Sequence, residues 1–347
     1  MSGNYALQIT IPLFNAKGFI MFKKLISTVT MAFAVLAAGT SAVHAQEADK
    51  VINFGIISTE SSKNLKQDWQ PILDELSKKI GMKVNGFFAS DYAGIIEGMR
   101  FGKVQMAWFG NKSAMEAVDR ASGEVFARVV NPDGSEGYYS LVGVNQDSPL
   151  KSVDDLIKNA KTLNFGIGDP NSTSGFLVPS YYIFAKNNLD SKTAFKTIRS
   201  ANHESNILAV ANKQVDAAVF ASDTMDRITA RLPETASKVR VIWKSPLIAS
   251  DPLVWRKDLA PATKTKIKDF FLSYGKTGPN AAQEKAQLEK LQFSGFKDSN
   301  DAQLTPVRQL ELFKDKTKIE ADATLNADEK KAKLDDINRK LSALAKA

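Results

Sequence analysis

The sequence of 347 residues contains no cysteine and only two histidines, His44 and His203. The lack of cysteine excludes disulfides, thiol catalysis and cysteine-based metal sites. With so few histidines, a zinc site is not expected either, because zinc ligands in proteins come mainly from these two residue types. We therefore expect no metal and no cofactor. A cysteine-free chain of this size fits an exported bacterial protein as well as a cytosolic one.

Clustered positive charge is also missing. Lysine and arginine outnumber the acidic residues by 46 to 38, which gives a formal net charge of +8. The basic residues form no run and do not alternate with aromatic residues, as they do on many nucleic-acid-binding surfaces. We expect a mildly basic solvated surface and no nucleic-acid partner.

The N-terminal region has the layout of a secretory signal peptide. From Met21 it reads MFKKLISTVTMAFAVLAAGTSAVHA, with two lysines, an apolar stretch of about fifteen residues and a small-residue cleavage site. We expect residues 1–45, an upstream extension plus the signal, to be removed after Ala45. The apolar stretch is short and rich in alanine and threonine for a membrane span, although an uncleaved anchor is the alternative. The remaining 302 residues, 46–347, would carry a charge of +5, because the removed part holds three lysines and no acid.

Strand-like and helix-like segments alternate through the rest of the chain. VINFGII (51–57) is followed by DWQPILDELSKKIG (68–81), in which Trp69, Ile72 and Leu76 lie on one helical face. This alternation predicts an α/β fold with mostly parallel sheets covered by helices. The pattern changes after YYSLVGV (138–144), and a second strand–helix series begins at LNFGI (163–167).

Two such series predict two lobes joined by two crossings, with a ligand cleft between them. We place lobe one at residues 46–142 and 245–316, and lobe two at 143–244. Residues 317–347 should form a charged helical tail with a narrow apolar stripe, made of Leu334, Ile337, Leu341 and Leu344. Such a helix either folds back on its own lobe or grips a partner, so a homodimer through this helix is one expectation.

The stretch DPNSTSGF (169–176) is the first candidate site. Ser172, Thr173 and Ser174 stand where a predicted strand turns into a predicted helix. A helix N-terminus exposes unpaired N–H groups and a partial positive charge, so it receives anions. Ordinary capping by Asn171 or Ser172 is the alternative. No Gly-x-x-x-x-Gly-Lys pattern occurs here, so the stretch is not a nucleotide P-loop.

Five further residues stand at the ends of predicted elements, where ligands often bind. They are His203, Tyr92, Tyr138, Asp223 and Asp251. The histidine and tyrosines could donate hydrogen bonds to an oxyanion, and the two carboxylates could pair with an ammonium group, although each could equally pack or cap locally. A hydrolase using Ser172 or Ser174 with His203 is disfavoured, because no Gly-x-Ser-x-Gly elbow surrounds these serines.

Several segments together resemble the periplasmic phosphonate-binding proteins of ABC-type uptake systems. They include NFGIISTES (53–61), FFASDYAGIIEGMRFGKV (87–104), GDPNSTSGFLVP (168–179) and IWKSPLIASDPLVWRK (242–257), and the likeness runs from about Val51 to Lys314. The resemblance implies a type II periplasmic-binding-protein fold, no enzymatic activity, a periplasmic location and an ABC permease at the inner membrane as partner.

The resemblance also implies roles for the candidate residues. Ser172–Ser174, with Tyr92, Tyr138 and His203, would hold the phosphonate. Asp223 and Asp251 would receive the amino group of a ligand such as 2-aminoethylphosphonate; phosphate, phosphite or a simple alkylphosphonate is the alternative ligand. The chain departs from the family pattern in three places. Asp223 replaces a glutamate, Phe109 replaces a tyrosine, and the stretch 219–221 is more apolar.

Overall fold

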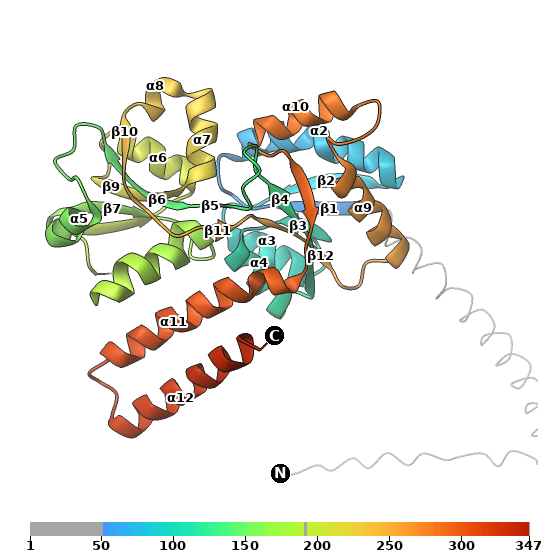
Figure 1. Ribbon diagram of the computed structural model, residues 1–347. Helices are drawn as coiled ribbons and strands as arrows, with labels where there is room; N and C mark the ends of the chain where they lie inside the picture. Colours follow the sequence, from blue (N-terminus) through green and yellow to red (C-terminus); the bar gives the residue numbers. More distant parts are fainter. Residues whose placement is uncertain (1–50, 191–192, 347) are drawn as a thin grey trace, which may run out of the picture. The chain divides into compact units, whose positions relative to one another are not determined.

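The computed structural model describes residues 51–190 and 193–346 (Figure 1). The residues from Val51 onward form one compact unit. The predicted signal peptide and its cleavage point after Ala45 lie outside the described residues. Within these ranges, no helix is both long and apolar enough to cross a membrane.

The first lobe is built on a six-stranded mixed sheet with the order β13-β4-β12-β3-β1-β2. β1 pairs in parallel with β2 and β3, whereas β12 and β13 run antiparallel to their neighbours, so the sheet is less parallel than expected. The strands are β1 (Val51–Ile56), β2 (Lys83–Phe88), β3 (Met106–Trp108), β4 (Gly123–Val130), β12 (Pro252–Arg256) and β13 (Gly295–Asp298). The helices of this lobe are α2 (Ser62–Ile80), α3 (Tyr92–Arg100), α4 (Asn111–Arg120), α9 (Pro261–Ser273), α10 (Ala281–Lys290) and the short η6 (Asp301–Leu304).

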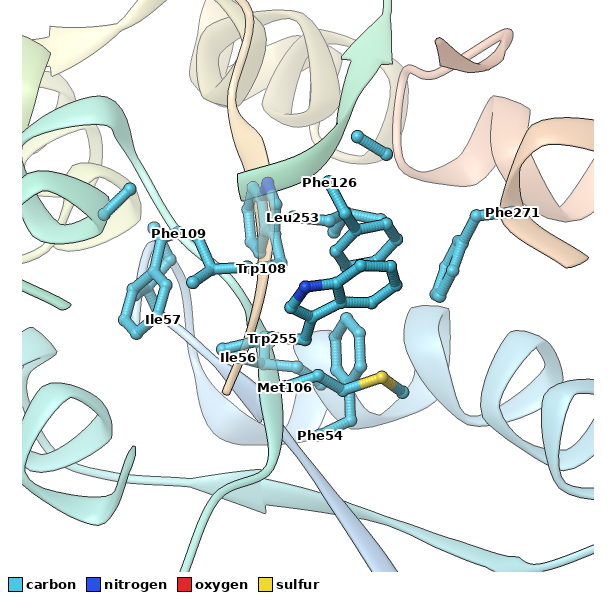
Figure 2. Close-up of a cluster of buried hydrophobic side chains, with 14 of the residues drawn as sticks. Phe54, Ile56, Ile57, Met106, Trp108, Phe109, Phe126, Leu253, Trp255 and Phe271 are labelled. Carbon is cyan, nitrogen blue, oxygen red and sulfur yellow. The ribbon is translucent and has the colours of Figure 1, made fainter. Parts of the chain in front are cut away.

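The helical periodicity read from 68–81 corresponds to α2. Ser61 caps its first turn by accepting a hydrogen bond from the Asn64 N–H, and Gly81, with φ of 72°, ends it. Trp69 and its apolar neighbours on the same face are buried against the sheet. The Trp69 ring lies 5.5 Å from that of Trp108 within an aromatic core that Figure 2 shows in part. This core fixes the strands whose carboxyl ends carry part of the site.

The second lobe is built on a five-stranded sheet with the order β10-β6-β9-β7-β8. Its strands are β6 (Ser140–Asn145), β7 (Asn164–Ile167), β8 (Thr197–Ser200), β9 (Ala217–Ala221) and β10 (Val239–Lys244). Its helices are α5 (Val153–Asn159), η2 (Ala160–Thr162), α6 (His203–Ala211), α7 (Ser222–Arg231) and α8 (Pro233–Ala236). The two crossings between the lobes pair with each other as a short antiparallel ribbon, β5 (Gly137–Tyr138) with β11 (Ile248–Ala249).

Two of the expected boundaries fall inside regular elements. β6 begins at Ser140 and belongs to the second sheet, so a boundary between residues 142 and 143 cuts this strand. The point at which the chain enters the second sheet is not visible in the sequence, because a single residue, Tyr139, separates β5 from β6. A tail starting at residue 317 likewise divides α11 (Thr305–Ala321). The remaining lobe limits stay a prediction.

The C-terminal region forms two long helices, α11 and α12 (Ala327–Leu344), which pack along each other (Figure 1). α11 contacts α4 of the first lobe and the helical segment of the second lobe that follows the serine-threonine stretch. On α12, Ile337 is buried and Leu334, Leu341 and Leu344 are half-buried. The apolar stripe is thus at least partly covered by folding back on α11; a homodimer stays a prediction.

The helix expected after DPNSTSGF is wound irregularly. It consists of two π-helical turns and one 3₁₀ turn, namely η3 (Thr173–Leu177), η4 (Ser180–Phe184) and η5 (Ala185–Asn187). Pro179 lies between the π turns and has no N–H to donate, which disfavours a regular α-helix there. The turn before η3 is tight: a Cβ added to Gly168 would lie 2.5 Å from the Gly175 Cα. Both glycines are needed for this close approach.

Candidate functional site

All eight residues singled out in the sequence line a single small cavity. Both lobes contribute to its wall, and the crossings supply Tyr138 and Asp251. The full lining is Ile57, Thr59, Tyr92, Gly110, Tyr138, Ser172, Thr173, Ser174, His203, Ala221, Asp223 and Asp251.

The three hydroxyl residues of the 172–174 stretch are buried and differ in their contacts. Ser172 caps η3, because its Oγ accepts a hydrogen bond of 2.9 Å from the Gly175 N–H. The Thr173 Oγ1 accepts a hydrogen bond of 2.8 Å from the backbone N–H of Lys112, in the first turn of α4 in the other lobe. Capping by Ser172, which the sequence allowed, is therefore present alongside an inter-lobe contact that it did not suggest.

The N-terminus of α4 also meets this cavity, through Gly110. Gly110 is the N-cap residue and has no side chain to satisfy the first N–H groups of the helix. A Cβ at this position would lie 3.3 Å from the Thr173 Oγ1, so only glycine leaves this approach unhindered. The helix therefore directs its partial positive charge toward the cavity. Sequence reasoning missed this contribution, although the strand-to-helix junction at AWFGN could have pointed to it.

His203 is buried at the start of α6, with its Nε2 3.4 Å from the Ser172 Oγ. Its Nδ1 has no hydrogen-bond partner among the described residues. Burial lowers the pKa of His203 to about 4, so the ring is neutral at neutral pH. A neutral imidazole carries one N–H, which can donate to an oxyanion without adding charge.

The two tyrosines are both buried in the cavity wall. Burial raises the pKa of both phenols well above the ordinary value, so both keep their proton and can donate. The backbone N–H of Tyr92 donates to Asp169 Oδ2 at 3.1 Å, which joins α3 to the second lobe. The negative charge of Asp251 adds to the effect of burial on the pKa of Tyr138.

Asp223 and Asp251 each keep one buried carboxylate oxygen, Oδ1, without a hydrogen-bond partner among the described residues. The other oxygen of Asp223 accepts a hydrogen bond of 3.1 Å from Arg227 Nη1. Burial, and then the nearby charge of Asp223, raise the pKa of Asp251 well above its ordinary value. A buried carboxylate without a partner is unfavourable, and a cation placed between these oxygens would relieve it.

Thr59 is a further lining residue that sequence reasoning missed. Its Oγ1 is buried and has no partner within the described part of the chain. Thr59 follows β1 at the carboxyl end of a parallel strand, the edge where α/β proteins bind ligands, so its position was a usable signal. Of the noted departures, Phe109 packs in the first-lobe core (Figure 2) and is absent from the cavity lining, while the stretch 219–221 reaches it only through Ala221.

Comparison with known proteins shows the family to which the chain belongs. Residues 54–304 match the family described as "ABC transporter, phosphonate, periplasmic substrate-binding protein". The chain belongs to this family. It is 54% identical over 312 residues to the phosphonates-binding periplasmic protein of Escherichia coli K12, covering 88% of this chain and 91% of the relative. It is also 30% identical to the phosphate-import protein PhnD of Mycolicibacterium smegmatis, covering 82% of this chain and 88% of that one.

A solved structure agrees with this assignment. The crystal structure of a binding protein component of an ABC phosphonate transporter from Pseudomonas aeruginosa superposes with a TM-score of 0.83 at 55% identity. The superposition covers 85% of this chain and 97% of the Pseudomonas aeruginosa chain. The predicted type II periplasmic-binding-protein fold is therefore confirmed. The protein is a phosphonate-binding periplasmic component of an ABC transporter rather than an enzyme, and the family implies a small-molecule ligand and a membrane permease as partners.

Proposed function

We propose that the cavity captures an aminoalkylphosphonate such as 2-aminoethylphosphonate. The phosphonate would lie at Ser172–Ser174 and the ammonium between Asp223 and Asp251. The observation that carries this proposal is the pair of buried Oδ1 atoms without partners, which line the same small cavity as a set of hydrogen-bond donors. A site that binds only an anion would not need these two carboxylate oxygens.

The phosphonate end is supported by the number and kind of donors. Hydroxyl groups of Ser172, Thr173 and Ser174, the phenols of the two tyrosines and the neutral His203 ring all line the cavity. The N-terminus of α4 adds a partial positive charge beside its N-cap residue, Gly110, which has no side chain. Hydrogen bonds to an ionised oxyanion are about twice as strong as neutral ones, so this set can hold a phosphonate without a lysine or arginine in the lining.

The amino group distinguishes this ligand from the alternative ligands. One relative is named for phosphate import, so phosphate, phosphite or a simple alkylphosphonate is the alternative ligand. A bare anion would leave the oxygens of Asp223 and Asp251 unpaired and would be repelled by them. A ligand with an ammonium group pairs with both carboxylates at once.

Calorimetric titration tests the proposal directly. Purified protein would be titrated with 2-aminoethylphosphonate, methylphosphonate, phosphate and phosphite. We expect the amino compound to bind tightest, and Asp223→Asn to weaken it while sparing methylphosphonate. Asp154→Asn is the control, because Asp154 is an exposed carboxylate on α5 of the same lobe and does not line the cavity. Equal affinity for methylphosphonate and the amino compound would remove the role of the carboxylates, and failure to bind any phosphonate would overturn the whole assignment of the cavity.

Binding would be coupled to lobe closure. Residues of both lobes line the cavity, so a bound ligand makes its full set of contacts only when the lobes are together, and it favours that state. The closed protein would then dock on the permease. We also propose that residues 1–45 direct export and are cleaved after Ala45; mass spectrometry of the periplasmic protein should find Gln46 as its first residue.

A further inference from the structure

A buried group of charges lies directly behind Asp223 and spans the two lobes. Glu60 follows β1 in the first lobe, and its carboxylate accepts hydrogen bonds from Arg227 and Arg231 of α7 in the second lobe. The side chains of Glu60 and Arg227 are only 1% and 2% exposed. None of these three residues lines the ligand cavity.

Arg227 connects this group to the site. Its Nη1 donates to Asp223 Oδ2 at 3.1 Å, and the guanidinium is held in place by Thr224 Oγ1 at 2.9 Å and the carbonyl of Leu291 at 3.3 Å. Thr224 lies in the second lobe and Leu291 in the first. Arg227 therefore occupies one oxygen of Asp223 and leaves the other, Oδ1, facing the cavity without a partner.

A third carboxylate extends this group. Asp68 joins it through Arg231, with 3.3 Å between Asp68 Oδ2 and Arg231 Nη1. The carboxylates of Glu60, Asp68 and Asp223 thus share two guanidinium groups. Among these three residues, the buried oxygen without a hydrogen-bond partner is Oδ1 of Asp223, which lines the cavity. An ammonium group of a ligand can pair with it there.

We propose that Glu60, Arg227 and Arg231 are positioning residues that set the selectivity for the ammonium end of the ligand. Arg227 orients Asp223. Glu60 pairs with Arg227 and thereby reduces how far Arg227 neutralises Asp223, so the charge of Asp223 is available to the ligand. Glu60 comes from the opposite lobe, so this arrangement is complete only in the closed protein. The proposal rests on the proposed function, because it concerns the same carboxylate.

Two substitutions that change the charge of this group in opposite directions test the proposal. The readout is the ratio of the affinities for 2-aminoethylphosphonate and methylphosphonate, measured by calorimetry. Glu60→Gln removes a negative charge paired with Arg227, so Arg227 should neutralise Asp223 more fully and the ratio should fall by about tenfold. Arg231→Gln removes a positive charge from the same group and should raise the ratio. Glu60→Asp keeps the charge and should largely restore the ratio.

Glu204→Gln is the matched control. Glu204 is also a buried carboxylate at the lobe boundary, and it accepts hydrogen bonds from the Ser61 N–H and from Asn64 Nδ2 at 2.8 Å. It has no hydrogen bond to Arg227 among the described residues, so its loss should weaken both ligands equally.

The proposal is overturned if Glu60→Gln and Arg231→Gln leave the ratio of affinities at the wild-type value, even when both affinities fall. The charged residues would then only hold the two lobes together. A wild-type ratio near one would instead refute the proposed ligand before any variant is made. If thermal unfolding shows that Glu60→Gln does not fold, Arg231→Gln alone decides, because the Arg231 side chain is 32% exposed and tolerates change more readily.

Discussion

The Thr173 hydroxyl oxygen accepts a hydrogen bond from the backbone N–H of Lys112 at 2.8 Å, so a residue of the second lobe caps a helix of the first. The N-cap residue of that helix, Gly110, has no side chain that could do this. The cap is therefore available to α4 only when the lobes meet. A side-chain cap stabilises a helix by about 1 kcal/mol, which here would favour the closed state.

Thr173→Val should weaken phosphonate binding by roughly 10- to 100-fold, because it removes both this cap and a hydrogen bond to the charged ligand. Valine has nearly the same shape as threonine, so the packing around η3 should be kept. Thr173→Ser keeps the hydroxyl and should bind close to wild type. Calorimetry with methylphosphonate checks both variants, and an unchanged affinity for the valine variant would show that the hydroxyl serves neither role.

Thr59→Val should reduce phosphonate affinity by roughly tenfold without lowering stability. The Thr59 hydroxyl is buried beside the cavity and has no partner within the described residues, so its removal leaves no group newly unsatisfied. Thermal unfolding of the ligand-free protein and calorimetry with ligand separate the two effects. A loss of stability with unchanged affinity would place Thr59 in the fold rather than in the site.

Binding of 2-aminoethylphosphonate should release a proton from Asp251. Burial raises the pKa of this carboxyl in the free protein, and a bound ammonium would favour the ionised form and lower the pKa again. The affinity for the amino compound should therefore fall as the pH falls below the raised pKa. Calorimetry in two buffers of different ionisation enthalpy measures the release.

Two comparisons isolate this effect from ionisation of the ligand. Methylphosphonate should show less proton release than the amino compound, because it brings no ammonium to the carboxylates. Asp251→Asn should abolish the difference between the two ligands. If the difference persists in this variant, the proton comes from another group.

His203 should make the ligand-free protein less stable as the pH falls from about 6.5 to about 4, whereas Asp251, with its raised pKa, contributes in the opposite direction. His203 has a pKa of about 4 in the folded protein against 6.5 as a model value, so the unfolded chain binds a proton first. The histidine contribution is complete above pH 6.5, and roughly 3 kcal/mol of the free energy of unfolding is lost over this range. Urea titrations at pH 7.5 and 4.5 measure the change, and His203→Gln should reduce it. An equal change in both proteins would assign it to the carboxylates.

A homodimer through α12 should be abolished by ending the chain after Ala321. Phe313 of α11 is 41% exposed and three leucines of α12 are only half-buried, so the helical pair keeps apolar surface for a partner. Sedimentation velocity should give twice the monomer mass for the full chain and the monomer mass for the shortened one. The same monomer mass for both would rule out this dimer.

Local patterns in the sequence predicted much of the fold. The spacing of Trp69, Ile72 and Leu76 predicted α2, because a helix buries residues three and four positions apart. The lobe boundary expected near residue 142 falls inside β6, because β5 and β6 follow one another almost without a break. The irregular winding after Ser172 was also missed, because the apolar pattern of a π turn differs little from that of an α-helix over five residues.

The site was predictable where one segment supplies the chemistry. Ser172, Thr173 and Ser174 are adjacent in sequence, and the resemblance to a family brought in the distant tyrosines and carboxylates, all of which line one cavity. The contacts of Thr173 with Lys112 and of Glu60 with Arg227 join residues 61 and 167 positions apart. No local pattern marks such pairs, because they depend on how the two lobes close on each other.

The short ribbon of β5 and β11 joins the two lobes, and two residues of the cavity wall belong to these crossing segments. Tyr138 lies on β5, and Asp251 stands two residues beyond β11. Thr173, Tyr92 and Asp223 are carried on the lobes themselves. If the lobes open by turning about the crossings, these three residues would move away from a bound ligand further than Tyr138 and Asp251. The last contacts of a departing ligand would then be with one hydroxyl and one carboxylate of the crossings.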